Sequence, residues 1–328
     1  MQKKDLGLLV LILVVGAVVA LINPRFLSPI NLANTANLVG LFGLFAIGQG
    51  FVIITGGIEL SVGSVIALLG VLFVSLVAGG TAWPVVALLM LALGVLIGLA
   101  HGLLITRLGM QPFIVTLCGL LIYRGVARFY TADATAGFVF GQTLPWLEWL
   151  TAGRTWGVPH SFVAMLVVAA VMWVVLHRSV FGRHLYAVGK NEEAARYAGV
   201  ATGRVIVAAY VICAVLTAVA AIFFAMYTRS ISPSSHGNFY ELYAIAAAVL
   251  GGFSLRGGEG SIVGVVLGAV LLQVLQNLVN LLGIPSSLNF AVMGSVILIG
   301  VLADQQFAEL RRRRAVRAQA EAQATAAE

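Results

Sequence analysis

The chain has 328 residues, of which 61% are hydrophobic and only 9% are charged, and its mean hydropathy is +1.04. This composition excludes an ordinary soluble globular domain and indicates a protein that lies mostly within a membrane. The net charge of +7 would suggest a nucleic-acid partner in a soluble protein. Here the basic residues lie between apolar runs, so membrane topology accounts for them and no nucleic-acid partner is expected.

Ten apolar runs follow one another along the chain. The first follows two lysines and lacks a small-residue cleavage site, so we interpret it as an uncleaved helix. The predicted spans are Leu6–Ile22, Leu38–Thr55, Leu60–Ala78, Trp83–Thr106, Phe113–Tyr130, Ser161–Leu176, Val205–Tyr227, Leu242–Val249, Ile262–Leu282 and Leu288–Ala303. A span needs about 20 residues, so we expect one short or broken helix near 242–250. The predicted fold is therefore an all-α integral membrane protein with about ten transmembrane helices.

The distribution of basic residues predicts the orientation of these spans. With an inner N-terminus, the outer loops hold only Arg25, Arg154 and Arg229. The inner loops and tails then hold fourteen basic residues: Lys3, Lys4, Arg107, Arg178, Arg183, Lys190, Arg196, Arg204, Arg256, Arg311, Arg312, Arg313, Arg314 and Arg317. This positive-inside bias places both termini in the cytoplasm. We predict one polytopic domain over 1–310, and over 311–328 a basic, then Ala/Gln-rich cytoplasmic tail at the lipid surface.

The polar interval Leu185–Arg204 separates the sixth and seventh runs and carries helix signals. Asn191 is a candidate N-cap, Glu192 and Glu193 fall in the first turn, and Gly199 is a candidate stop. Spacing alone leaves two interpretations open. The interval is either a solvated loop helix or a cytoplasmic helix that docks on a soluble partner.

Small residues follow a helical spacing inside two spans. Gly94, Gly98 and Gly102 share one face of the fourth span, and Gly264 and Gly268 share a face of the ninth. Such faces let helices approach closely. They serve either packing or hinge motion, and the spacing does not separate the two.

Polar residues inside the spans are candidates for a translocation pathway, because they are costly against lipid. Charged candidates are Glu59, Arg124 and Glu241, for which an internal ion pair is the structural alternative, and His101 lies inside the fourth span. The amides at 273, 276, 277 and 280 are three or four residues apart, so all four share one helix face. The pathway candidates are Gln49, Glu59, Gln273, Gln276, Asn277 and Asn280.

Signals of an enzyme are scarce. The chain has no nucleotide-binding P-loop, no His-Glu-x-x-His and no nucleophile elbow. The two cysteines, Cys118 and Cys213, lie inside apolar runs without a neighbouring histidine, so we expect both to be buried and predict no disulfide. No catalytic residue, metal site or bound cofactor is predicted.

Several motifs together resemble the permease subunits of bacterial ABC importers, in the family of sugar and branched-chain amino acid permeases. They are Gly56-Gly57-Ile58-Glu59-Leu60-Ser61-Val62-Gly63-Ser64, Gln111-Pro112-Phe113-Ile114-Val115-Thr116-Leu117, Arg124-Gly125-Val126, the block Tyr240–Gly252, Ser254-Leu255-x-Gly257-Gly258, and Asn280-Leu281-Leu282-Gly283. The resemblance covers about 26–304 and fits the sugar branch better. Glu59 stands where sugar permeases usually have Asp, and Tyr243 where Asp is frequent.

The resemblance implies two five-helix halves of inverted topology and a cytoplasmic coupling loop over about 178–204. It implies that a coupling helix docks on an ABC ATPase through Asn191, Glu192, Glu193, Ala194, Ala195, Arg196 and Gly199. ATP would be bound by the partner ATPase subunits, and a periplasmic or lipid-anchored sugar-binding protein would deliver a monosaccharide. A second permease copy or a related permease would complete the pore in the bacterial inner membrane.

Three other functions remain open from the residues. An ion-coupled secondary carrier of a small polar solute would need titratable pairs within spans, for which few residues are available. A branched-chain amino acid ABC permease would share the same architecture. An intramembrane enzyme would need a clustered nucleophile, metal or acid–base pair.

Overall fold

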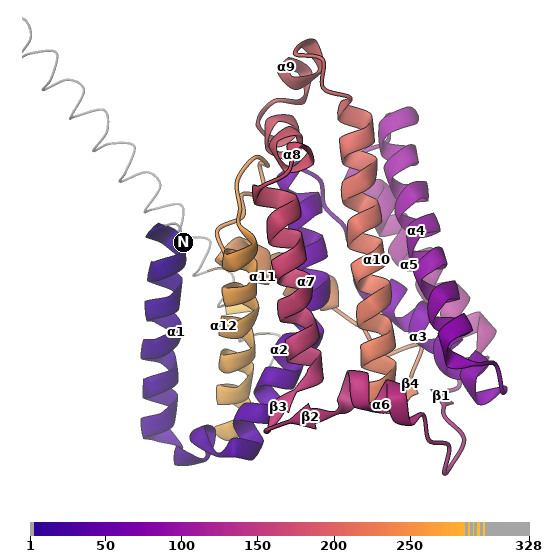
Figure 1. Ribbon diagram of the computed structural model, residues 1–328, viewed down its shortest axis with the longest axis vertical. Helices are drawn as coiled ribbons and strands as arrows, with labels where there is room; N and C mark the ends of the chain where they lie inside the picture. Colours follow the sequence, from indigo (N-terminus) through magenta and orange to yellow (C-terminus); the bar gives the residue numbers. More distant parts are fainter. Residues whose placement is uncertain (1–2, 286–287, 289–290, 292–293, 296–297, 299–328) are drawn as a thin grey trace, which may run out of the picture.

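The computed structural model describes residues 3–285, 288, 291, 294–295 and 298, and it is a bundle of helices (Figure 1). Seven described helices are long and apolar enough to cross a membrane. They are α1 (Lys3–Ile22), α2 (Pro29–Ile54), α4 (Trp83–Arg107), α5 (Pro112–Tyr130), α7 (His160–His177), α10 (Thr202–Thr228) and α12 (Ile262–Leu281). The protein is therefore a multi-pass, all-α membrane protein.

Two further apolar helices are shorter. They are α3 (Val62–Ala78) and α11 (Tyr240–Leu250). The prediction of a short helix near 242–250 is confirmed, since α11 has only 11 residues. The tenth predicted span, Leu288–Ala303, falls mostly outside the described residues, and the tail over 311–328 falls wholly outside them.

Short elements close the two ends of the bundle (Figure 1). One end, here called the α9 end, carries α8 (Val180–Lys190) and α9 (Glu192–Tyr197). The opposite end, here called the α6 end, carries η1 (Pro24–Leu27), α6 (Pro145–Ala152), β1 (Ala136–Gly137), β2 (Arg154–Thr155), β3 (Val158–Pro159) and β4 (Ser230–Ile231). Strands β1 and β4 pair antiparallel, as do β2 and β3.

Helix α2 begins nine residues earlier than the predicted span, which started at Leu38. The Oγ of Ser28 accepts a hydrogen bond from the backbone N–H of Asn31, and Pro29 occupies the first helical turn. A capping serine followed by proline is a strong start signal. The prediction was wrong because it followed hydropathy, whereas the first turns of α2 carry three asparagines and a threonine.

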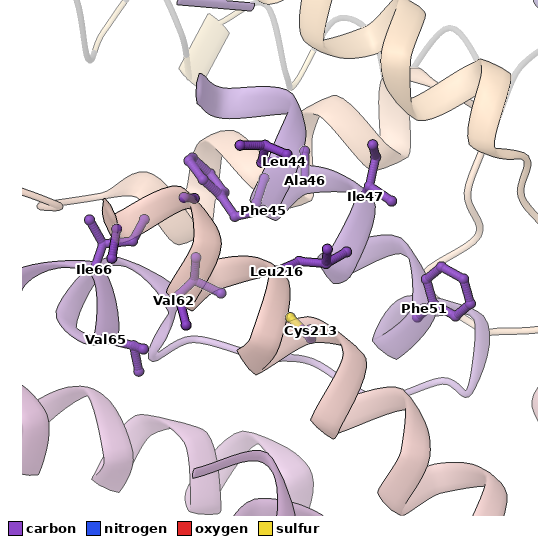
Figure 2. Close-up of a cluster of buried hydrophobic side chains, with 14 of the residues drawn as sticks. Leu44, Phe45, Ala46, Ile47, Phe51, Val62, Val65, Ile66, Cys213 and Leu216 are labelled. Atoms are coloured by element: carbon purple, nitrogen blue, oxygen red, sulfur yellow. The ribbon is translucent and has the colours of Figure 1, made fainter. Parts of the chain in front are cut away.

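The core of the bundle lies where α2, α3 and α10 meet. In α2, 89% of the span is buried, against 67% in α10 and only 11% in α1. Figure 2 shows Phe45 and Phe51 from α2 gathered with side chains of α3 and with Cys213 and Leu216 of α10. Cys213 is buried as predicted, but Cys118 is exposed on α5, so the prediction that both cysteines are buried was half wrong.

Glycines bring α4 and α10 into close contact. A Cβ on Gly98 would lie 2.5 Å from the Cα of Val211, and one on Gly102 would lie 2.7 Å from the Cα of Val207. Only residues without a side chain permit this approach. Gly268 likewise faces the backbone of α11, and Gly264 faces Gly251 directly after that helix, so both predicted glycine faces are packing faces here.

Candidate functional site

Helix α9 is a polar helix that stands at one end of the bundle, beyond α8 (Figure 1). The Oδ1 of Asn191 accepts a hydrogen bond of 2.9 Å from the N–H of Ala194, which caps the helix as predicted. Gly199 has φ +84°, a left-handed conformation that suits glycine and ends the helix. The local sequence therefore determines both ends of α9.

The side chains of α9 leave one exposed surface. Arg196 donates to Glu192 at 2.7 Å, and the hydroxyl of Thr202 donates to the same carboxylate oxygen at 3.1 Å. Among the predicted coupling residues only Ala195 is buried, while Asn191, Glu192, Glu193, Ala194, Arg196 and Gly199 are exposed. Sequence reasoning missed Tyr197, which is 86% exposed at the end of α9. An aromatic ring beside a charged helix in a polar loop was the available signal.

The end of α8 connects α9 to the bundle. The hydroxyl of Tyr186 donates to the carbonyl oxygen of Gly260 at 2.7 Å, and the N–H of Gly258 donates to the carbonyl oxygen of Ile54 at 2.8 Å. Gly189 of α8 packs so closely against Ile54 and Gly258 that a Cβ on it would collide with their backbone atoms. A displacement of α9 and α8 would thus reach the end of α2 and the loop before α12.

Glu59 lies in the extended segment between α2 and α3 and is buried. Its Oε1 accepts hydrogen bonds from the N–H and the Oγ of Ser61, at 2.6 and 2.7 Å. Its Oε2 lies 2.7 Å from Nδ1 of His101, whose Nε2 lies 2.9 Å from the hydroxyl of Tyr123. This network ties the extended segment to α4 and α5. The structural alternative for Glu59, an internal pair, is thereby observed.

Arg124 organises the segment before α11. Its Nη1 donates to the carbonyl oxygens of Pro233 and His236, at 2.8 and 2.6 Å. Glu241 is buried in the first turn of α11, where a carboxylate suits the helix dipole. Gly237 of this segment meets Gly63 of α3 so closely that a Cβ on either would collide with the other backbone. The starts of the two short helices therefore meet inside the bundle.

The amides of α12 have different environments. Asn277 exchanges hydrogen bonds with Asn31 of α2 at 2.8 and 3.0 Å, and Asn280 is exposed. Gln273 is buried and its Nε2 has no hydrogen-bond partner among the described residues, and the same holds for Oε1 of the half-buried Gln276. On α2, both amide atoms of the fully buried Gln49 also lack a partner within that part of the chain. Such groups are costly unless something else binds them.

Two aromatic rings line a cavity together with Gln273. The cavity has a volume of about 10 Å³, and its other walls are Leu272 and alanines of α2, α11 and α12, beside Phe42 and Tyr243. The ring centroids of Phe42 and Tyr243 are 5.4 Å apart, and Tyr240 lies 4.8 Å from Phe42. Sequence reasoning did not join these rings to the amides. Amides beside aromatic rings suit an uncharged polar ligand.

The described residues contain no group of three or more His, Cys, Asp or Glu that would hold a metal ion. Buried polar groups inside a helical membrane bundle and an exposed polar helix at one end are the features expected of a membrane transport component. The chain belongs to the family of branched-chain amino acid transport system permease components, whose profile matches residues 31–301.

The curated relatives cover nearly the whole chain. It is 38% identical over 305 residues to the ribose import permease protein of Escherichia coli K12, covering 93% of this chain and 94% of that protein. It is 39% identical to the ribose import permease protein of Bacillus subtilis 168, with the same shares covered. The galactofuranose transporter permease protein of E. coli K12 is 34% identical, with 86% and 80% covered. No solved structure matches this chain. The resemblance drawn from the motifs is confirmed.

Proposed function

We propose that this protein is the permease subunit of an ATP-driven ABC importer that moves a monosaccharide across the bacterial inner membrane. The observation that carries the proposal is the match over almost the full length to relatives named as ribose import permeases. The fructose import permease protein of Bifidobacterium longum is also 34% identical over 286 residues. Amides and aromatic rings in the bundle interior fit a polar, uncharged solute.

In this proposal α9 is the coupling helix. An ABC ATPase binds ATP and docks on Asn191, Glu192, Glu193, Ala194, Ala195, Arg196 and Gly199, while this chain binds no cofactor. The exposure of α9 and its connection through α8 to Ile54 and Gly258 support a route from nucleotide binding to the helices around the pathway. Both termini and the α9 end then face the cytoplasm, in agreement with the positive-inside bias.

The pathway is proposed to run beside α2, α11 and α12, past Gln49, Gln273, Gln276 and Asn280. A cavity of about 10 Å³ holds no sugar, so these helices must separate during transport. Asn277 and Glu59 hold neighbouring segments together in this conformation. The ten-span count with two inverted halves, the second permease and the sugar-binding protein belong to the same proposal.

The test is uptake into proteoliposomes that contain the permease, its ATPase and its binding protein. Radiolabelled ribose should accumulate only with ATP, and leucine should not. Accumulation of leucine in place of ribose would favour the amino acid branch, which the family description includes. ATP-independent uptake that a protonophore abolishes would show a secondary carrier instead.

A further inference from the structure

A groove at the α9 end lies between α4 and α10 and has a volume of about 680 Å³. Its walls are apolar side chains that lie one and two helical turns inside the bundle: Leu99, Leu103, Val207 and Val211. The groove exists because α4 and α10 are held closely together by Gly98 and Gly102, so larger side chains diverge on the flank of the contact. Leu103 is 43% exposed, so the groove is open at the side.

Three arginines surround the mouth of this groove. Arg107 ends α4, Arg204 lies in the first turn of α10, and Arg196 comes from α9. In the part of the chain that the structure describes, neither Arg107 nor Arg204 has an acidic partner. None of the described residues that line the groove is acidic. Glu192 on α9 already bonds to Arg196 and Thr202. The mouth therefore carries an excess of positive charge.

We propose that this groove binds one phospholipid with an anionic headgroup. The phosphate contacts Arg107 and Arg204, and an acyl chain lies along Leu103 and Val207. Charge complementarity selects the headgroup, because guanidinium groups bind phosphate with paired hydrogen bonds. The apolar walls select a lipid over a free anion, because inorganic phosphate would leave them uncovered. The proposal rests on the inward orientation of the α9 end proposed above.

The position of Arg196 gives this lipid a role beyond solvation. Arg196 belongs to α9 and also lines the groove, so a bound headgroup touches the coupling helix and both transmembrane helices at once. A lipid in this groove stabilises one position of α9 relative to α4 and α10. Anionic lipid would thereby regulate how α9 presents itself to a partner.

The experiment is native mass spectrometry of the purified full-length chain, released from nanodiscs that hold equal amounts of phosphatidylglycerol and phosphatidylcholine. The wild type should retain phosphatidylglycerol in preference. In R107Q/R204Q the retained phosphatidylglycerol should fall about tenfold. The matched control R183Q/R256Q removes two other exposed arginines from the same end and should retain phosphatidylglycerol like the wild type.

A second variant tests the acyl chain. L103W fills the groove and keeps every arginine, so it should also lose phosphatidylglycerol.

Equal retention of phosphatidylglycerol by R107Q/R204Q and the wild type would overturn the proposal. Loss in R107Q/R204Q but not in L103W, with displacement by inorganic phosphate, would show an anion site without a lipid. Retention of no lipid by the wild type, with R107Q/R204Q failing to bind the ATPase, would reassign the arginines to protein docking. Lipid retention is measured without a transport assay, so a failure of the lipid proposal can be told apart from a failure of the proposed transport function.

Discussion

Glu59 and His101 lie 42 residues apart in the chain, yet their side chains meet at 2.7 Å with exposed fractions of only 7% and 3%. The pair joins the extended segment before α3 to α4. Tyr123 of α5 continues the network from the other side of the imidazole. Three segments thus depend on one buried contact, which explains why a membrane protein tolerates a carboxylate there.

Replacing His101 with Ala should destabilise the protein by about 3 kcal/mol, because it leaves Oε2 of the buried Glu59 carboxylate without its partner. The measurement is the denaturation midpoint in detergent. His184→Ala is the control, since that histidine lies on α8 and makes no side-chain hydrogen bond in the described chain. The double variant Glu59→Leu/His101→Leu should recover part of the loss. A wild-type midpoint for His101→Ala would contradict the structural role of the pair.

Gly98→Ala should also destabilise the fold, by about 1–3 kcal/mol, because the new methyl group would meet the backbone of α10 at 2.5 Å. Gly125→Ala on α5 is the matched control, since nothing described lies within 4 Å of its added Cβ. There the better helix propensity of Ala, worth up to ~1 kcal/mol, should leave stability equal or higher. The measurement is the thermal melting point of both variants. Equal melting points would mean that α4 and α10 move apart to accommodate the methyl group at little cost in stability.

Glu193→Lys should abolish co-purification of the ATPase while leaving the protein folded. Glu193 is exposed on α9 and has no partner in the described chain. Reversing its charge therefore changes the docking surface and breaks no contact within the protein. Gly199→Trp should act similarly by distorting a residue at φ +84°. Ala152→Lys is the control, because Ala152 is exposed on α6 at the opposite end of the bundle. Normal co-purification of both α9 variants would remove α9 from the docking surface.

Cysteines at Gln276 and Asn280 should react with water-soluble thiol reagents in at least one nucleotide state, if α12 lines the pathway. The background replaces Cys118 and Cys213 with Ala, so that only the new thiol is labelled. Leu121→Cys on α5 is the control, because an apolar side chain that is 64% exposed on a membrane helix faces lipid. Labelling at none of the α12 positions in any state would make these amides packing residues.

Features that depend on neighbours in sequence were predictable. The start of α9 at Asn191, its end at Gly199 and the shortness of α11 follow from capping chemistry and from the length of an apolar run. The start of α2 was also encoded, in Ser28 and Pro29, although hydropathy concealed it. Family membership followed from whole motifs, which need no tertiary contact to be recognised.

The tertiary structure alone decided which polar residues find partners. The sequence grouped Gln273, Gln276 and Asn277 on one face of α12, but only the fold pairs Asn277 with Asn31, which is 246 residues away, and leaves amide atoms of the other two without partners in the described chain. The sequence likewise ranked Glu59 and His101 separately and did not join them. The helical repeat depends only on residues near one another in the sequence, so the sequence alone fixes which residues share a face. What that face meets depends on the packing of distant helices, and that packing determines the free energy of each buried polar group.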